Sequence, residues 1–405
     1  MDFHGGGDES ETEMRRPPSP STPPSDGVDS AKSTGSIEDD DHQAFSDDEE
    51  DEDLEKYHPF TVDDFPRVSS EFDEQSDAVF QNPDIQLRGP SAMFLFRAFN
   101  DPVVEKHRHF FGRQYQLYDE SEVNVNNNVR TIDCSHGCRC VPSGVLQFID
   151  LKIAGYRHAQ PGCANIFGFF AVRENVEPLR NYVYRRGIDN CEAVNVKLDT
   201  GIAHLSLTSP ARCIHMISRV LFEFKLSVRT DDQPEDGPKD DLLIEGCTEF
   251  TDFMNMYKTG PFIETRRLYG EKCGLDIKFL VLWNAVQAKV DVEILRAPVD
   301  GLNLNLYAKT SGFRDAIRLF SGVTESGCRM SSVVGVMRYS YLILCIEGSL
   351  KDGGFSQELP CCMWQGRFAS GYHGTVHEVV YLHDSTKISV KVTWKAVDCL
   401  HDLEH

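Results

Sequence analysis

Alternating apolar and polar residues mark several short strands along this chain. In the clearest case, Val220 to Val228, every even-numbered residue is apolar and the odd-numbered ones include Glu223, Lys225 and Ser227. Successive side chains of a strand point to opposite faces, so this pattern predicts a half-buried antiparallel strand. Similar alternation occurs at 149–153, 203–208, 275–281, 286–294, 302–306 and 388–394, and two further strands are predicted at 341–346 and 376–382.

Turn residues separate these segments, as at Gln160-Pro161-Gly162 and Asp300-Gly301. Many short strands with such punctuation predict an all-β chain with an antiparallel β-sandwich-like body. That body, 141–397, is either one large sandwich or two tandem ones, with halves at 141–264 and 265–397. One or two short helices are also expected: one at Pro102–Phe111, with Arg314–Phe320 as the candidate for a second.

The first 88 residues have a different composition from the body. Met1–Lys56 holds nineteen Asp and Glu against four Lys and Arg, a net −15 of the chain's −23. Such a segment cannot bury apolar surface and its charges repel, so 1–88 is predicted to be a disordered acidic tail. It is either a regulated interaction tail or a solvating one. Residues 89–140 form a linker with the short helix, and 398–405 form a C-terminal tail.

Charge and cysteine usage narrow the partners and the compartment. An acidic chain repels phosphate backbones, which makes nucleic acid an unfavoured partner. No apolar run approaches the ~20 residues needed to span a bilayer, so no membrane association is expected. The chain has thirteen Cys and no apolar N-terminal signal. These features favour a reducing compartment, cytoplasmic or nuclear, with mostly free thiols.

Two segments resemble metal sites only in part. Cys134, His136, Cys138 and Cys140 offer zinc ligands, but their spacing does not fit a zinc knuckle. The loop 230–241 is rich in Asp but lacks the ligand offsets of a calcium-binding EF-hand. No metal and no cofactor are therefore predicted.

The candidate binding residues are Arg173, Arg186, Asp189 and Asn190. An arginine fork can hold an anion or a carboxylate partner. The competing interpretation is structural, because Asp-Asn is common in turns and Asp189 can pair with an arginine that fixes two strands. We find no phosphate-binding loop, dinucleotide fingerprint, zinc-protease helix or nucleophile elbow in the sequence, and predict no catalytic residue.

Several segments in order resemble a plant family, much expanded in grasses, that is known only as domain of unknown function 6598. The resemblance covers about Cys140 to Val397. It is carried by Cys140–Pro142, Leu146–Ile153, Phe167–Glu174, Leu179–Tyr182, Arg186–Asn190, Leu207–Arg212, Gly366–Ala369 and Val380–Ser385. Phe167, Glu174 and Ser209 depart from the family's usual residues.

Two classes of function remain open. The first is a non-enzymatic protein-interaction module, with an unknown protein partner that the acidic tail could contact. The second is an enzyme or RNA-directed activity with an unrecognised site, because the resemblance implies relatives joined to ribosome-inactivating domains and linked to stress or defence. The glycosidase helix of those domains is absent from this sequence. The lack of a catalytic motif favours the first class.

Overall fold

The protein is described from a computed structural model. The described residues are 62, 90–93, 114–124, 140–157, 162–175, 177–217, 219–230, 240–251, 260–270, 272–299, 301–350, 362–383, 386–396 and 398–399. The expected acidic tail (apart from residue 62), the expected helix at Pro102–Phe111, the ligands Cys134, His136 and Cys138, and the loop 231–239 lie outside them.

The all-β prediction is confirmed, and the strands pair antiparallel except β1 (Ser91–Met93), which pairs parallel with β11 (Phe262–Tyr269). Apart from the single helical residue Gln114, the helical element among the described residues is a 3₁₀ turn, η1 (Ile188–Asn190). The helix predicted at Arg314–Phe320 is wrong, because strand β14 (Ile317–Thr324) occupies this segment. Ile317 lies opposite Ala308 and Phe320 lies opposite Leu306 in β13 (Leu302–Thr310). Cross-strand pairing therefore overrides the local helical spacing.

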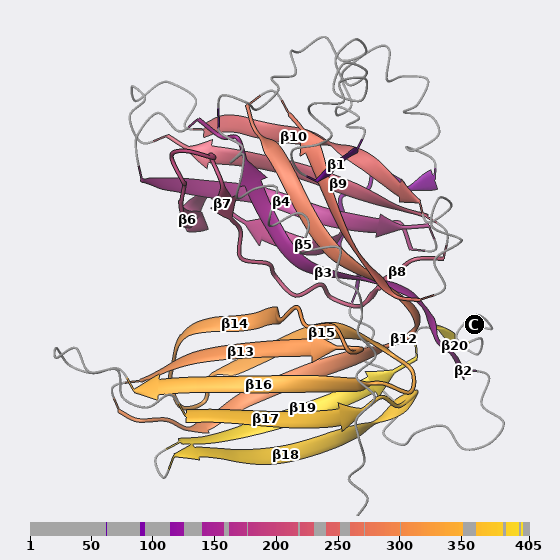
Figure 1. Cartoon of the computed structure of the whole chain (residues 1–405), viewed down its shortest axis with the longest axis vertical. Coiled ribbons are helices and arrows are strands. Elements are labelled where there is room, and N and C mark those ends of the chain that lie inside the picture. The colour runs from indigo at the N-terminus through magenta and orange to yellow at the C-terminus, as the bar shows by residue number, and fades with distance from the viewer. Residues whose placement is uncertain are drawn as a thin grey trace, which may run out of the picture. The chain divides into compact units, whose positions relative to one another are not determined.

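The first sandwich packs two sheets around one core (Figure 1). One sheet contains β1 (Ser91–Met93), β11 (Phe262–Tyr269), the first part of β12 (Gly274–Arg296), β3 (Ser143–Ala154), β7 (Ala203–His204) and β8 (Ile214–His215). The other contains β10 (Asp240–Thr251), β9 (Arg219–Arg229), β4 (Cys163–Glu174), β5 (Asn181–Arg186) and β6 (Glu192–Asn195). Six buried rings fill its centre: Phe148, Phe170, Phe222, Phe224, Phe250 and Phe279.

The second sandwich also packs two sheets face to face (Figure 1). One sheet contains β15 (Arg329–Met337), the second part of β12, β19 (Thr386–Lys395) and β18 (His373–His383). The other contains β14, β13, β16 (Tyr341–Leu350) and β17 (Cys362–Ala369). A separate short ladder joins β2 (Cys140–Val141) to β20 (Asp398–Cys399), so the expected C-terminal tail begins with a paired segment.

Strand β12 belongs to both sandwiches. Its 23 residues pair with β11 up to Val281 and with β3 up to Leu282 and again at Ala285, and they pair with β15 from Ala285 and with β19 from Gln287 onward. Between these parts Asn284 has a φ of 51°, in the left-handed region that a non-glycine residue rarely adopts. The two cores therefore meet within β12, and not near residue 264.

The edge of β15 is closed by side chains rather than by another strand. Its alternate N–H groups at Val333, Gly335 and Met337 donate to Ser209 Oγ at 2.7 Å, Gln147 Oε1 at 2.9 Å and Ser311 Oγ at 2.8 Å. Unpaired strand edges invite association with other chains, and these bonds satisfy the exposed donors. Gln147 and Ser209 belong to the first sandwich, so the same bonds tie the second sandwich to it.

Candidate functional site

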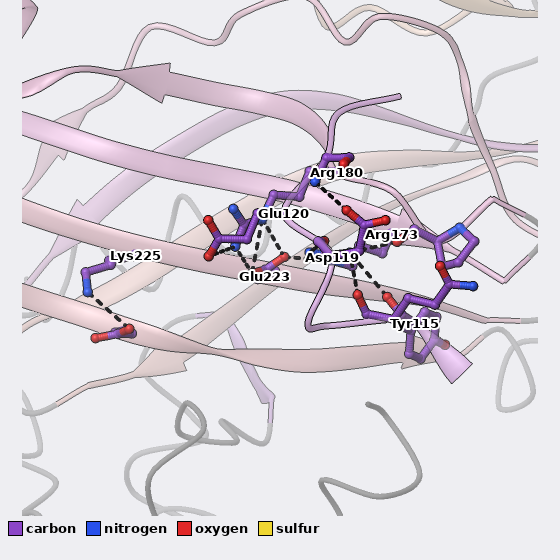
Figure 2. Close-up of polar contacts among 11 residues, drawn as sticks. Tyr115, Asp119, Glu120, Arg173, Arg180, Glu223 and Lys225 are labelled. Carbon is purple, nitrogen blue, oxygen red and sulfur yellow. Dashed lines mark hydrogen bonds and ion pairs between the residues drawn. The ribbon is translucent and has the colours of Figure 1, made fainter. Parts of the chain in front are cut away.

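Arg173 lies at the end of β4 and is fully buried. Its Nε donates to Glu223 Oε2 at 2.7 Å and its Nη2 donates to the Asp119 carbonyl at 2.7 Å (Figure 2). Its Nη1 donates to the carbonyl oxygens of Pro178, Tyr115 and Gln116 at 2.7, 3.2 and 3.3 Å. All three guanidinium nitrogens of Arg173 therefore donate hydrogen bonds to acceptors within the protein.

Arg180 approaches the same carboxylate from the start of β5. Its Nη2 lies 2.5 Å from Glu223 Oε1 and its Nε lies 3.1 Å from Oε2, while its guanidinium stacks 4.6 Å from the centre of the Phe169 ring. Figure 2 shows both arginines directed at Glu223. A buried carboxylate with two arginine partners is an ionic cluster whose charges and hydrogen bonds are mutually satisfied.

This cluster fastens the segment 114–124, which we call the strap, to the outer face of β4 and β9. Three strap carbonyls accept from Arg173, and the Tyr115 hydroxyl donates to Glu249 at 2.7 Å. Burial and the Glu249 carboxylate raise the pKa of Tyr115, so the phenol keeps its proton. Tyr115 and Leu117 also pack with Leu221 and Cys247. The role that the geometry supports for Arg173 is structural anchoring.

The other three candidate binding residues lie elsewhere. Arg186 is opposite Gly168 in the β4–β5 ladder, five positions from Arg173 and so roughly 17 Å from it along the strand. Its Nη2 donates to the Ser206 carbonyl at 3.3 Å. Asp189 and Asn190 lie exposed in η1, where Asn190 N donates to the Gly187 carbonyl at 3.0 Å. The structure separates Arg173 from this turn, and anion binding at the turn stays a prediction.

A second buried cluster surrounds Glu174, which the sequence did not single out as a site residue. Its Oε1 accepts from the His215 backbone N–H at 2.8 Å and its Oε2 lies 2.7 Å from Arg212 Nη1. Arg212 Nη2 also lies 3.0 Å from Glu177. The cluster holds the segment 205–215 against β4, and no feature of the sequence indicated that Glu174 and Arg212 come together.

Burial controls the protonation of this cluster. It raises the pKa of Glu174 to about 7, although Arg212 and the His215 N–H act in the opposite direction. Burial, with the nearby charges of Arg212 and Lys395, lowers the pKa of His215 to about 3. The imidazole is therefore neutral at physiological pH, while Glu174 exchanges its proton near neutrality.

Glu174→Gln is expected to change how stability depends on pH. Because the folded pKa of Glu174 exceeds its unfolded value, its contribution is present at low pH and is lost as the pH rises through about 7. Between about pH 5.5 and pH 8, wild type should lose about 2 kcal/mol of unfolding free energy relative to the variant. Urea titrations at both pH values measure this difference. His215 contributes with the opposite sign in both proteins and cancels, so parallel pH profiles would refute the expectation.

A small cavity lies between β3, the 207–214 segment, β14 and β15. Its volume is about 30 Å³, enough for about two water molecules but not for a substrate. Its polar lining residues are Gln147, Thr208, Ser209, Arg318 and Ser332, and the buried Thr208 hydroxyl has no hydrogen-bond partner among the described residues. We interpret the cavity as a hydration site between the sandwiches.

Two further searches cover only the described residues. No group of three His, Cys, Asp or Glu side chains there is placed to hold a metal ion. No helix there is long and apolar enough to cross a membrane.

Comparisons with known proteins identify a family without a known activity. No curated protein matches the chain. Among solved structures, human GIVD cytosolic phospholipase A2 is 12% identical over 64% of this chain and 33% of its own, with a TM-score of 0.23. The tandem C2 domains of extended-synaptotagmin 2 are 11% identical over 68% of this chain and 100% of theirs, with a TM-score of 0.22.

Likenesses at this level establish neither a shared fold nor a shared function, and this chain spans about a third of the phospholipase. The family model described as domain of unknown function (DUF6598) matches residues 145–392, which include both sandwiches and the two buried clusters. The chain therefore belongs to the DUF6598 family.

Proposed function

We propose that this chain is a non-catalytic protein-interaction module. The supporting observation is the distribution of charge. Residues 285–396, which include the second sandwich, hold twelve Lys and Arg against ten Asp and Glu, a net +2, although the whole chain carries −23. The acidic excess of the chain is therefore absent from this part, and positive side chains on its surface can offer an acidic protein partner a complementary site.

The charged residues best suited to chemistry are used inside the fold. Arg173 and Arg180 bind Glu223, and Arg212 binds Glu174. These pairs hold the strap and the 205–215 segment in place, so their role is structural. The predicted acidic tail is proposed as a second contact, with a basic part of the same partner, in the cytoplasm or nucleus. A link to plant stress or defence rests on the resemblance alone.

The test is an affinity capture with the full chain as bait, followed by mass spectrometry of bound proteins and sequencing of bound RNA. We expect a protein partner that is released by moderate salt, because the proposed attraction is electrostatic. Loss of that partner from a chain lacking 1–88 would assign the contact to the tail. Enrichment of ribosomal RNA without a protein partner would overturn the proposal, and an adenine-release assay would then test the RNA-directed alternative.

A further inference from the structure

Three tyrosines and two arginines gather at one end of the second sandwich. Arg338 and Tyr339 lie in the β15–β16 hairpin, and Tyr341 begins β16. Arg367 lies in β17, and Tyr372 lies in the following turn. We call these residues the Tyr–Arg surface: Arg338, Tyr339, Tyr341, Arg367 and Tyr372.

Arginine–tyrosine stacking holds this surface together. The Arg338 guanidinium lies 3.9 Å from the centre of the Tyr372 ring and 4.9 Å from that of Tyr339. The Arg367 guanidinium lies 3.7 Å from the centre of the Tyr341 ring. Stacked pairs of this kind are stiff, so little side-chain entropy remains to be lost when a partner binds.

Two of the three tyrosines are exposed to solvent, while Tyr372 is half-buried. Tyr339 is 89% exposed and Tyr341 is 41% exposed. Tyrosine and arginine are enriched at the energetic centres of protein interfaces, because each combines a large contact area with a polar end. The composition of the surface is therefore that of a binding site.

The backbone presents Tyr339 in a costly conformation. Its φ is 62°, in the left-handed region that favours glycine and that a bulky residue rarely adopts. The hairpin is fixed in this form by its neighbours, since Arg338 N donates to the Asn284 carbonyl at 2.7 Å and Ser370 N donates to the Ser340 carbonyl at 3.0 Å. Glycine would fit this turn better than tyrosine, so stability does not explain the exposed ring.

The charge of the Tyr–Arg surface indicates which kind of partner it can bind. Neither Arg338 nor Arg367 has a carboxylate within ion-pair distance in the part of the chain that the structure describes. Lys309 extends the positive charge of this surface. In the sheet, Ile343 of β16 pairs with Lys309 of β13 on one side and with Arg367 of β17 on the other. Guanidinium groups without a carboxylate, beside exposed phenols, suit a partner rich in Asp and Glu.

We propose that the Tyr–Arg surface binds an acidic segment of a partner protein. This inference rests on the proposed function and adds the place and the chemistry of the contact. A peptide is favoured over single-stranded RNA, because guanidinium groups already cover one face of the Tyr341 and Tyr372 rings, and stacking of bases needs such faces free.

The test uses the full chain and a fluorescein-labelled peptide of Glu and Asp residues, with labelled oligouridine as the competing probe. Tyr339→Gly and Arg367→Gln are each expected to weaken peptide binding about tenfold or more in fluorescence anisotropy. Tyr339→Gly should leave the melting temperature unchanged or higher, because it relieves the strained turn. The matched controls are Tyr118→Gly, at another tyrosine that is 80% exposed, and Arg329→Gln, at an exposed arginine already paired with Glu293.

Binding of the peptide that both test variants lose and both controls keep supports the inference. Binding of oligouridine with that pattern, equal binding by all variants, or no peptide binding overturns it. A protein partner captured equally by wild type, Tyr339→Gly and Arg367→Gln would also overturn it and leave the proposed function standing. A lower melting temperature for Tyr339→Gly would refute the strain argument on which the inference depends.

Discussion

Replacing Glu223 with Gln is expected to reduce the free energy of unfolding by about 3–5 kcal/mol. Glu223 is 3% exposed and is the carboxylate that Arg173 and Arg180 share. The amide of Gln keeps the shape but not the charge, so two buried guanidinium groups lose their counter-ion. Removing one partner of a buried ionic group costs far more than the group contributes as a whole, because the remaining charge stays desolvated.

Urea unfolding of the full chain measures this loss. Lys225→Gln is the matched control, because Lys225 lies two residues further along β9, is exposed, and pairs with Glu245 at 3.3 Å. Surface ion pairs contribute less than about 1 kcal/mol, so this variant should unfold almost like wild type. If the two variants were equally stable, the buried cluster would not be a principal anchor of the fold.

The Glu223 variant should also loosen the strap. Arg173 holds the strap only through backbone carbonyls, and its own orientation depends on Glu223. We therefore expect faster protease cleavage within 114–124 in Glu223→Gln than in Lys225→Gln, under conditions where both stay folded. Equal cleavage would show that the other contacts of the strap, which include the Tyr115–Glu249 hydrogen bond and the packing of Tyr115 and Leu117, are enough to secure it.

The alternation of apolar residues predicted the strands well wherever one face of a strand is buried. The strand predicted at Val220–Val228 is β9, Arg219–Arg229, and its even-numbered side chains enter the first core. This succeeds because period-two burial is a local property of the sequence. The predicted helix at Arg314–Phe320 failed for the opposite reason, since its strand partner β13 is fixed only by tertiary packing.

Strand β12 shows a subtler limit of the same reasoning. Odd-numbered residues from Leu275 to Val281 face the first core, and even-numbered residues from Val286 to Ile294 face the second. This change of phase predicted two strands. In the structure both segments belong to one continuous strand, and the phase changes at Trp283 and Asn284. The left-handed backbone of Asn284 reverses which face of the strand the odd-numbered and even-numbered side chains occupy.

The buried clusters were beyond the reach of the sequence. Arg173 was singled out as a binding residue, but its acceptors come from 115–119, Pro178 and Glu223, which only the folded chain brings together. Glu174 was noticed as a departure from a family pattern and not as a site residue. Its raised pKa depends on burial, and burial of a single carboxyl is decided by long-range packing.

Phe222→Ala is expected to cost about 3–5 kcal/mol and to unfold both sandwiches together. Phe222 is fully buried, and its ring centre lies 5.6, 5.6, 5.7 and 6.1 Å from those of Phe148, Phe170, Phe279 and Phe250. Alanine leaves a cavity that strands of two sheets cannot close. Phe222→Leu keeps most of the volume and should lose less than about half as much.

Tryptophan fluorescence can measure whether the second sandwich unfolds together with the first. The chain has three, and Trp364 and Trp394 pack in or against the second core, while Trp283 lies at the junction. In a Trp283→Phe background, fluorescence reports the second sandwich alone, whereas circular dichroism reports the strands of both. Because β12 is shared and Gln147 and Ser209 bind the edge of β15, Phe222→Ala should shift both urea transitions by the same amount. A fluorescence midpoint that stays at the wild-type value while circular dichroism shifts would show instead that the sandwiches unfold independently.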